Sequence, residues 1–88
     1  MAICDYQFPF ESTSEELYSK MKALVEQKGG SIQGDSANGE ITFKRFFMVV
    51  IKATYSIANQ VISIEIQKNL LNIDCIKIES EIRNALFN

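Results

Sequence analysis

The clearest pattern in the chain lies in residues 46 to 67. Apolar and polar side chains alternate with a period of two on either side of a short polar segment, which is typical of two antiparallel strands joined by a tight turn. A loop of Ala58 and Asn59 places Tyr55 opposite Ile62, whereas a loop of Asn59 and Gln60 shifts the partners by two residues. Either even loop keeps the apolar side chains on one face, so we expect a hairpin of this kind.

The same alternation assigns the two faces of the hairpin. Tyr55 and Ile64 belong to the apolar face, which we expect to face the helices. Lys52 and Glu65 belong to the polar face and are opposite each other if the loop begins at Ala58. An opposite-charge pair across two strands contributes roughly 0.2 to 1 kcal/mol.

Three further segments are predicted to be strands. Residues 4 to 10 alternate with four apolar side chains on one side, and Pro9 near the end predicts an edge position or a termination. Residues 31 to 34 are a short strand candidate, followed by a connection in which Asn38-Gly39 is the strongest turn signal. Residues 40 to 44 alternate again, and a pairing of Lys44 with Met48 would bring this strand against the hairpin without a conflict of faces.

Two helices are predicted from capping signals and apolar spacing. Ser12 with Glu15, or Thr13 with Glu16, has the spacing of a capping box, and Gly29-Gly30 ends the helix that follows. The second helix begins after a cap at Asn72 or Asp74. The stripe of the first helix consists of Leu17, Met21, Leu24 and Val25 and fades at Lys28, and that of the second consists of Cys75, Ile78, Ile82, Ala85 and Leu86.

These elements predict an α+β fold in the order β-α-β-β-β-β-α. The 88 residues form one domain, residues 1–88, with a single modest core. Two helices laid on one face of an antiparallel meander sheet would bury that face in a two-layer sandwich. The connection at residues 68 to 73 carries three apolar side chains, which we expect beneath the edge of the sheet.

The joint at residues 44 to 48 lacks Gly, Pro, Asn and Asp, the usual turn residues. The strands either extend through it with a bulge or place Phe46 and Phe47 at an exposed tip beside two cations. We favour an arrangement in which both rings fold back over the end of the core. If they stay exposed, Phe46, Phe47, Met48 and Val50 form a surface for self-association, for an entrance to an apolar cavity, or for lipid contact.

Composition excludes several classes of chemistry. The chain has no histidine, which removes the Ser-His-Asp and Cys-His arrangements and the commonest general base. The formal charge of -2 argues against a nucleic-acid partner. Asp35 begins a segment that only faintly resembles a calcium loop, so we predict no metal and no cofactor. The remaining catalytic candidates, which are Cys4, Cys75 or Tyr55 with Glu65 or Glu79, each have a simpler structural explanation, and we predict that the protein is not an enzyme.

Cysteine usage and hydropathy suggest a cytoplasmic protein. Cys4 and Cys75 lie near opposite ends of the chain, and two cysteines without close spacing favour reduced core residues over a disulfide. The start of the chain lacks the pattern of a signal peptide. The apolar run from residue 46 to 51 is about a third of the roughly 20 residues that a membrane span needs.

A resemblance emerges from four segments taken together. Residues 30 to 35, a glycine turn at Gly39, the meander ending at residues 62 to 66 and the closing segment 78 to 82 resemble small uncharacterised bacterial domains similar to the polyhydroxyalkanoate-granule family. In outline these resemble a shortened helix-grip fold of the START and Bet v 1 type. The resemblance implies an apolar ligand held between sheet and last helix, in a candidate pocket made by Tyr55, Ile64, Ile78 and Ile82.

Two binding functions therefore compete. The first is a small non-enzymatic interaction module that forms a homodimer or docks a protein partner through the Phe46 to Val50 surface. The second is a binder of an apolar or amphipathic small ligand between the sheet and the C-terminal helix. The first is the sequence-based preference.

Overall fold

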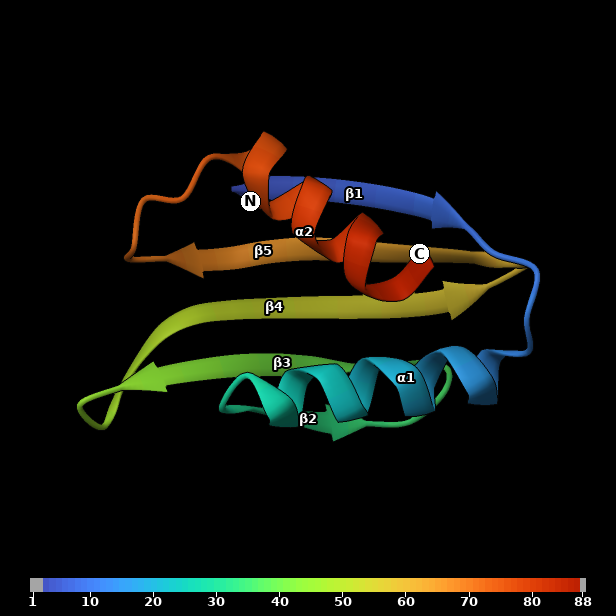
Figure 1. Ribbon diagram of the computed structural model, residues 1–88, viewed down its shortest axis with the longest axis horizontal. Coiled ribbons are helices and arrows are strands. Elements are labelled where there is room, and N and C mark those ends of the chain that lie inside the picture. The colour runs from blue at the N-terminus through green and yellow to red at the C-terminus, as the bar shows by residue number, and fades with distance from the viewer. Residues whose placement is uncertain (1–2, 88) are drawn as a thin grey trace.

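The computed structural model describes residues 3–87 as an α+β fold with one antiparallel sheet and two helices (Figure 1). The order β-α-β-β-β-β-α agrees with the sequence prediction. The elements are β1 (Cys4–Pro9), α1 (Ser14–Gln27), β2 (Gly30–Gly34), β3 (Asn38–Arg45), β4 (Met48–Ala58), β5 (Val61–Asn69) and α2 (Cys75–Phe87). Neither helix is long and apolar enough to cross a membrane within the described residues.

The five strands follow the order β1-β5-β4-β3-β2, so β1 lies at an edge of the sheet, as Pro9 predicted. Its alternating side chains are buried on one face, as expected. The hairpin of β4 and β5 uses Asn59 and Gln60 as its loop, so Tyr55 lies opposite Ile64. The alternative loop at Ala58-Asn59, with Tyr55 opposite Ile62, is wrong, although both loops predict the same buried face.

The expected pairing of Lys44 with Met48 is wrong, because Lys44 pairs with Val49 and a bulge changes the register further along β3. Arg45 pairs with Met48, and the register then shifts between Phe43 and Lys44, so that Phe43 pairs with Ile51. A second shift follows Lys52 in the pairing of β4 with β5. The predicted pair of Lys52 with Glu65 does not form, because the Asn59-Gln60 loop places Glu65 opposite Thr54 and the second shift places Lys52 opposite Lys68. The Lys52 ammonium instead lies 3.5 Å from the Glu40 carboxylate.

The turn between β2 and β3 lies earlier than Asn38-Gly39, the pair with the strongest turn signal. The Asp35 carboxylate accepts hydrogen bonds from the backbone N–H groups of Ala37 and Asn38, at 2.8 and 3.1 Å. These bonds hold the pKa of Asp35 below its usual value. Because the Asp35 side chain closes the turn, Asn38 and Gly39 are free to pair as the first residues of β3.

Helix α1 begins and ends as the sequence predicts. The Thr13 hydroxyl accepts a hydrogen bond from the Glu16 backbone N–H at 3.1 Å, and Gly29 takes a positive φ after the last turn. Figure 1 draws both helices in front of the sheet, with α1 over β2 and β3 and α2 over β5. Leu17, Met21 and Val25 from α1 and Leu86 from α2 join the same buried cluster as the sheet residues.

The prediction of two reduced cysteines is wrong. Cys4 on β1 and Cys75 at the start of α2 form a disulfide, with 5.7 Å between their Cα atoms. Seventy-one positions separate the two residues, so spacing alone gave no signal of their proximity. The sheet places its first strand beside β5, and the connection after β5 returns the chain to that strand.

Candidate functional site

A cavity of about 340 Å³ lies between the sheet and the two helices. Its floor consists of side chains from the three central strands, namely Ile41, Phe43, Ile51, Ala53, Ile64 and Ile66. All of these are apolar, because strand alternation places them on the same face of the sheet. The floor of the cavity therefore offers no hydrogen bond from a side chain.

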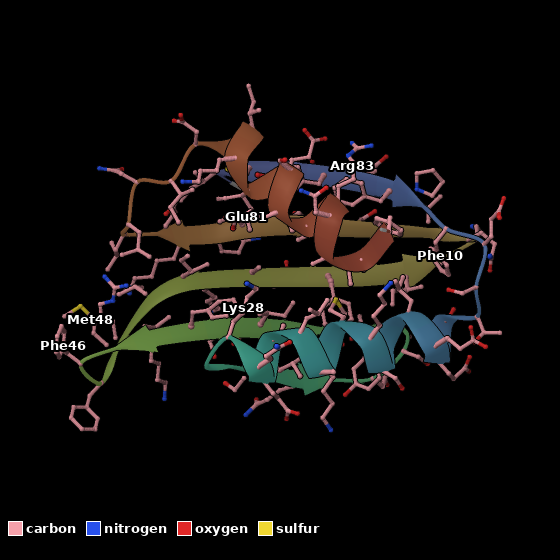
Figure 2. All side chains as sticks on the ribbon, in the orientation of Figure 1. Phe10, Lys28, Phe46, Met48, Glu81 and Arg83 are labelled. Carbon is pink, nitrogen blue, oxygen red and sulfur yellow. A yellow bond between two sulfur atoms is a disulfide. The ribbon has the colours of Figure 1, made fainter. Side chains whose placement is uncertain are left out.

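The walls come from the two helices. On α1 they are Met21, Leu24 and Val25, followed by Lys28 directly after the last residue of the helix, and on α2 they are Ile78, Glu81, Ile82, Ala85 and Leu86. Ile73, in the connection before α2, completes the lining. Figure 2 shows Lys28 and Glu81 on the two helices, on either side of the space that separates them. Both side chains are exposed, so the cavity has an apolar interior and a polar margin.

The margin continues into a shallow groove on the outer surface between the helices. Leu24, Lys28, Glu81 and Ala85 line both the cavity and the groove, and Gln27 and Asn84 complete the groove. The ion pairs of the described residues join Lys52 to Glu40 and Arg83 to Glu79, so Lys28 and Glu81 are in neither. A ligand in this place would meet apolar groups below and polar groups above.

Helix α2 is attached at both of its ends. At its start, the disulfide joins Cys75 to β1, and the Tyr6 hydroxyl donates a hydrogen bond to the Cys75 carbonyl at 2.6 Å. At its end, the Lys20 ammonium donates to the Leu86 carbonyl at 2.8 Å, and the rings of Phe8 and Phe87 are 5.6 Å apart. The central residues of α2 thus lie over the cavity between two fixed ends.

Three of the four predicted pocket residues line this cavity. Ile64, Ile78 and Ile82 belong to its surface, whereas Tyr55 does not. Tyr55 is only 3% exposed, and its hydroxyl donates to the Asp35 carbonyl at 2.8 Å. A Cβ atom at Gly39 would lie 2.7 Å from the Tyr55 ring, so glycine makes room for that ring.

Burial raises the pKa of Tyr55 to about 12, with smaller contributions from Tyr18 and Asp35. The phenol is therefore a neutral hydrogen-bond donor at ordinary pH. Its role is to attach β4 to the turn between β2 and β3. Tyr55 is not among the residues that line the cavity.

Sequence reasoning missed most of the α1 wall and the polar margin. Met21, Leu24 and Val25 carried a signal, since their spacing placed them on the apolar side of α1, but it indicated only core packing. Lys28 continued the spacing of that side of α1, but it was interpreted only as the fading end of the apolar stripe. Glu81 gave no sign of a site, because a charged residue near an apolar stripe is ordinary on a helix surface. Their relation depends on the distance between the helices, which periodicity does not report.

The predicted partner surface is exposed rather than folded onto the core. Phe46 and Phe47 are 90% and 103% exposed, which contradicts the expectation that they cover the end of the core. Met48 is 57% exposed, and Val50 is half-buried. Figure 2 shows Phe46 and Met48 at the end of the sheet opposite Phe10. The connection after β5 is exposed at Leu70 and Leu71, so the prediction that its apolar side chains lie beneath the edge of the sheet is wrong for these two, whereas Ile73 is half-buried and lines the cavity.

The catalytic candidates from the sequence do not form a reactive group. Cys4 and Cys75 are joined in the disulfide, so neither offers a thiol. Glu79 accepts a hydrogen bond from Arg83 at 3.1 Å, and Glu65 lies on β5 opposite Thr54, while Tyr55 donates to a backbone carbonyl. Residues 3–87 contain no group of three or more His, Cys, Asp or Glu side chains that could hold a metal ion.

No family model matches the chain, and neither the curated proteins nor the solved structures contain a significant match to it.

Proposed function

We propose that the protein binds a small amphipathic ligand, with its apolar part in the cavity between the sheet and the two helices. The observation that carries this proposal is the cavity itself, about 340 Å³ with a lining that is apolar except for Lys28 and Glu81. Small-molecule sites are mostly apolar spaces of about 300 to 1,000 Å³ with a few polar groups at defined places. This chain has that combination, with its polar groups at the margin.

The volume limits the size of the ligand. One water occupies about 30 Å³ in the liquid, and a methylene group occupies nearly as much. The cavity therefore accommodates an apolar chain of about ten carbons. Each methylene transferred from water contributes about 0.8 kcal/mol, so such a chain gains useful affinity without any directional contact.

The margin determines which head group the ligand carries. Lys28 and Glu81 give it one cation and one anion, and Gln27 and Asn84 add two amides. This mixture provides hydrogen-bond donors and acceptors without a dominant charge. A neutral alcohol or amide head group therefore suits the margin as well as a carboxylate does.

Two broader features belong to the same proposal. The first is a two-layer sandwich, in which both helices cover one face of the sheet and enclose the cavity. The second is the shortened helix-grip outline, supported by the last helix lying over the cavity and by a first strand next to the last. The proposed role is binding without catalysis, because the lining contains no nucleophile with an adjacent base.

Decan-1-ol and decanoic acid are the probes for this proposal. Isothermal titration calorimetry on the whole chain should show saturable binding of both, with affinity rising from octanol to decanol and then falling sharply at hexadecanol. Ile78→Phe should abolish binding, because the added ring occupies the cavity. It should also raise the unfolding temperature, because it fills space that lacks contacts.

Ile76→Phe is the matched control. Ile76 lies two residues away on the same helix, is 80% exposed and does not line the cavity. This variant should bind decanol as the original chain does. Equal binding by the Ile78 and Ile76 variants, or no decanol binding by the original chain, would refute the proposal.

The cytoplasmic location stays a prediction. A reducing cytoplasm opposes the Cys4–Cys75 bond, since disulfides persist chiefly in oxidising compartments. Alkylation of free thiols before lysis, followed by mass spectrometry, measures whether the two cysteines are joined in the cell. A fully alkylated pair is the result expected for a cytoplasmic protein.

A further inference from the structure

The exposed end of the molecule is defined here as residues 44–50 and 68–71. It combines the turn between β3 and β4 with the end of β5 and the residues that follow. The Leu70 backbone N–H donates to the Val50 carbonyl at 2.8 Å, and Ile51 pairs with Asn69, so the two segments lie side by side. They form one surface rather than two separate loops.

Large apolar side chains project from this surface. Phe46 and Phe47 are almost completely exposed, and Met48 and Leu70 are more than half exposed. Both phenylalanines also have positive φ values, of 54° and 65°. This backbone conformation is unfavourable for a residue with a bulky side chain. The turn therefore presents two aromatic rings to solvent where asparagine or glycine would serve stability better.

The charges of the exposed end all have one sign. It contains Lys44, Arg45 and Lys68, and none of the chain's 11 acidic residues. Of the described residues, Lys52 on the neighbouring part of β4 is paired with Glu40, whereas the three cations of the exposed end are in no ion pair. The protein as a whole is negative, with a formal charge of -2. The positive charge is thus local to the apolar surface.

We infer that the exposed end docks on the surface of an anionic lipid bilayer. Phenylalanine and leucine side chains enter the boundary between head groups and acyl chains, and basic side chains beside them pair with lipid phosphates. Association of two copies through the same surface would bring like charges together, which makes a second copy the poorer occupant. This inference goes beyond the ligand cavity and does not depend on it.

The test uses the whole chain and two kinds of vesicle. In co-sedimentation, the protein should bind vesicles of phosphatidylcholine mixed with phosphatidylserine, and should bind pure phosphatidylcholine at least about tenfold more weakly. Phe46→Ser with Phe47→Ser should reduce binding to the anionic vesicles by more than about tenfold. Ile76→Ser, which also removes an exposed apolar side chain, should leave binding unchanged.

Charge reversal tests the basic residues separately. Lys44→Glu with Arg45→Glu should weaken anionic-vesicle binding by at least about fivefold for each cation removed. Lys22→Glu with Lys77→Glu changes the net charge equally at exposed helix positions and is the matched control. Equal losses in the two double variants would show a response to net charge alone and would overturn the inference.

A spectroscopic reporter makes the result independent of how the serine variant folds. The chain contains no tryptophan, so Phe47→Trp introduces a single indole at the tip, and Ile76→Trp introduces one elsewhere. Anionic vesicles should shift the emission of the first variant to shorter wavelength and leave the second unchanged. No shift at position 47 would overturn the inference.

Self-association is the competing outcome. Sedimentation velocity without vesicles should show a mass that does not change with concentration. A dimer that disappears in the Phe46→Ser, Phe47→Ser variant would assign the surface to a second copy and overturn the bilayer inference. Decanol binding by the same variant should be unchanged, so failure at the exposed end remains distinct from failure of the cavity.

Discussion

Two of the hairpin turns of the sheet, those between β3 and β4 and between β4 and β5, have nearly the same backbone and very different side chains. Phe46 and Phe47 have φ values of 54° and 65°, and Asn59 and Gln60 have values of 55° and 61°. Both turns connect their strands through two residues in the left-handed region, as two-residue hairpins require. Asparagine adopts that conformation at little cost, whereas it is unfavourable for phenylalanine. The comparison shows that the backbone of a tight turn does not require phenylalanine, so the two rings at positions 46 and 47 need a separate explanation.

The surroundings of the two turns differ as well. The Gln60 side chain donates hydrogen bonds to the carbonyls of Phe10 and Ser12, at 2.9 and 3.1 Å. The Phe10 backbone N–H donates in return to the Gln60 carbonyl. The Asn59-Gln60 turn is therefore fixed by the connection from β1 to α1, while the rings of Phe46 and Phe47 project into solvent. We interpret the Asn59-Gln60 turn as structural and the Phe46-Phe47 turn as a binding surface.

The largest expected effect comes from removing the disulfide, which joins the start of α2 to β1. Cys4→Ser with Cys75→Ser should lower the free energy of unfolding by about 4 kcal/mol, because the bond closes a loop across 71 positions. Urea denaturation measures this loss. Hydrogen exchange should accelerate at the start of α2 more than at the Asn59-Gln60 turn. Equal acceleration of hydrogen exchange at both places would contradict the expectation that the Asn59-Gln60 turn is fixed independently of the disulfide.

The next effect has the opposite sign. Phe46→Asn with Phe47→Gly gives the exposed turn the residues that its backbone favours, and should raise the free energy of unfolding by about 1 to 2 kcal/mol. The same variant should lose vesicle binding. Thermal unfolding and co-sedimentation measure the two results. A destabilised variant would show that the rings support the fold after all.

A smaller effect is expected at the other turn. Gln60→Ala removes both side-chain hydrogen bonds to the β1–α1 connection and should cost about 1 kcal/mol, since Gln60 is exposed. Gln67→Ala is the control, because among residues 3–87 the Gln67 amide makes a single long hydrogen bond, 3.5 Å to the Thr54 hydroxyl. Urea denaturation of the two variants should show the larger loss at position 60, and vesicle binding should remain in both.

The smallest effect at ordinary pH concerns Tyr55. Its pKa is about 12 in the folded chain and 10.0 for an unperturbed tyrosine. Between these values the folded state keeps the proton that the unfolded state has lost, so stability falls as pH rises from 10 to 12 and is unaffected below pH 10. Tyr55→Phe should show a shallower fall over that range in thermal unfolding. An unchanged slope would contradict this assignment.

The sequence predicts the elements and their buried faces well, because alternation and helical spacing report directly on which side of an element is apolar. The sequence was less informative about strand register, that is, which residues pair across neighbouring strands. Loops at Ala58-Asn59 and Asn59-Gln60 bury the same side chains, so the pattern could not choose between them. The lack of turn residues at 44 to 48 left a bulge there open, but no residue type pointed to the bulge after Lys52. Local pattern therefore identified the face of each strand but not its partners.

The candidate site was predicted in part. Ile64, Ile78 and Ile82 line the cavity as expected, since they lie on the inner faces of a strand and a helix. The cavity itself depends on how far apart the two helices lie, which is a property of packing between elements. The disulfide escaped prediction for the same reason, because contact between Cys4 and Cys75 arises only once the first strand has paired with the last.

The disulfide between β1 and α2 also has a mechanical consequence. It encloses residues 4 to 75 in a covalent ring, so a force applied near the two ends of the described chain would extend only the short segments outside that ring. In single-molecule stretching, the oxidised protein should resist as a nearly inextensible unit. Reduction should release the full contour length of the enclosed chain.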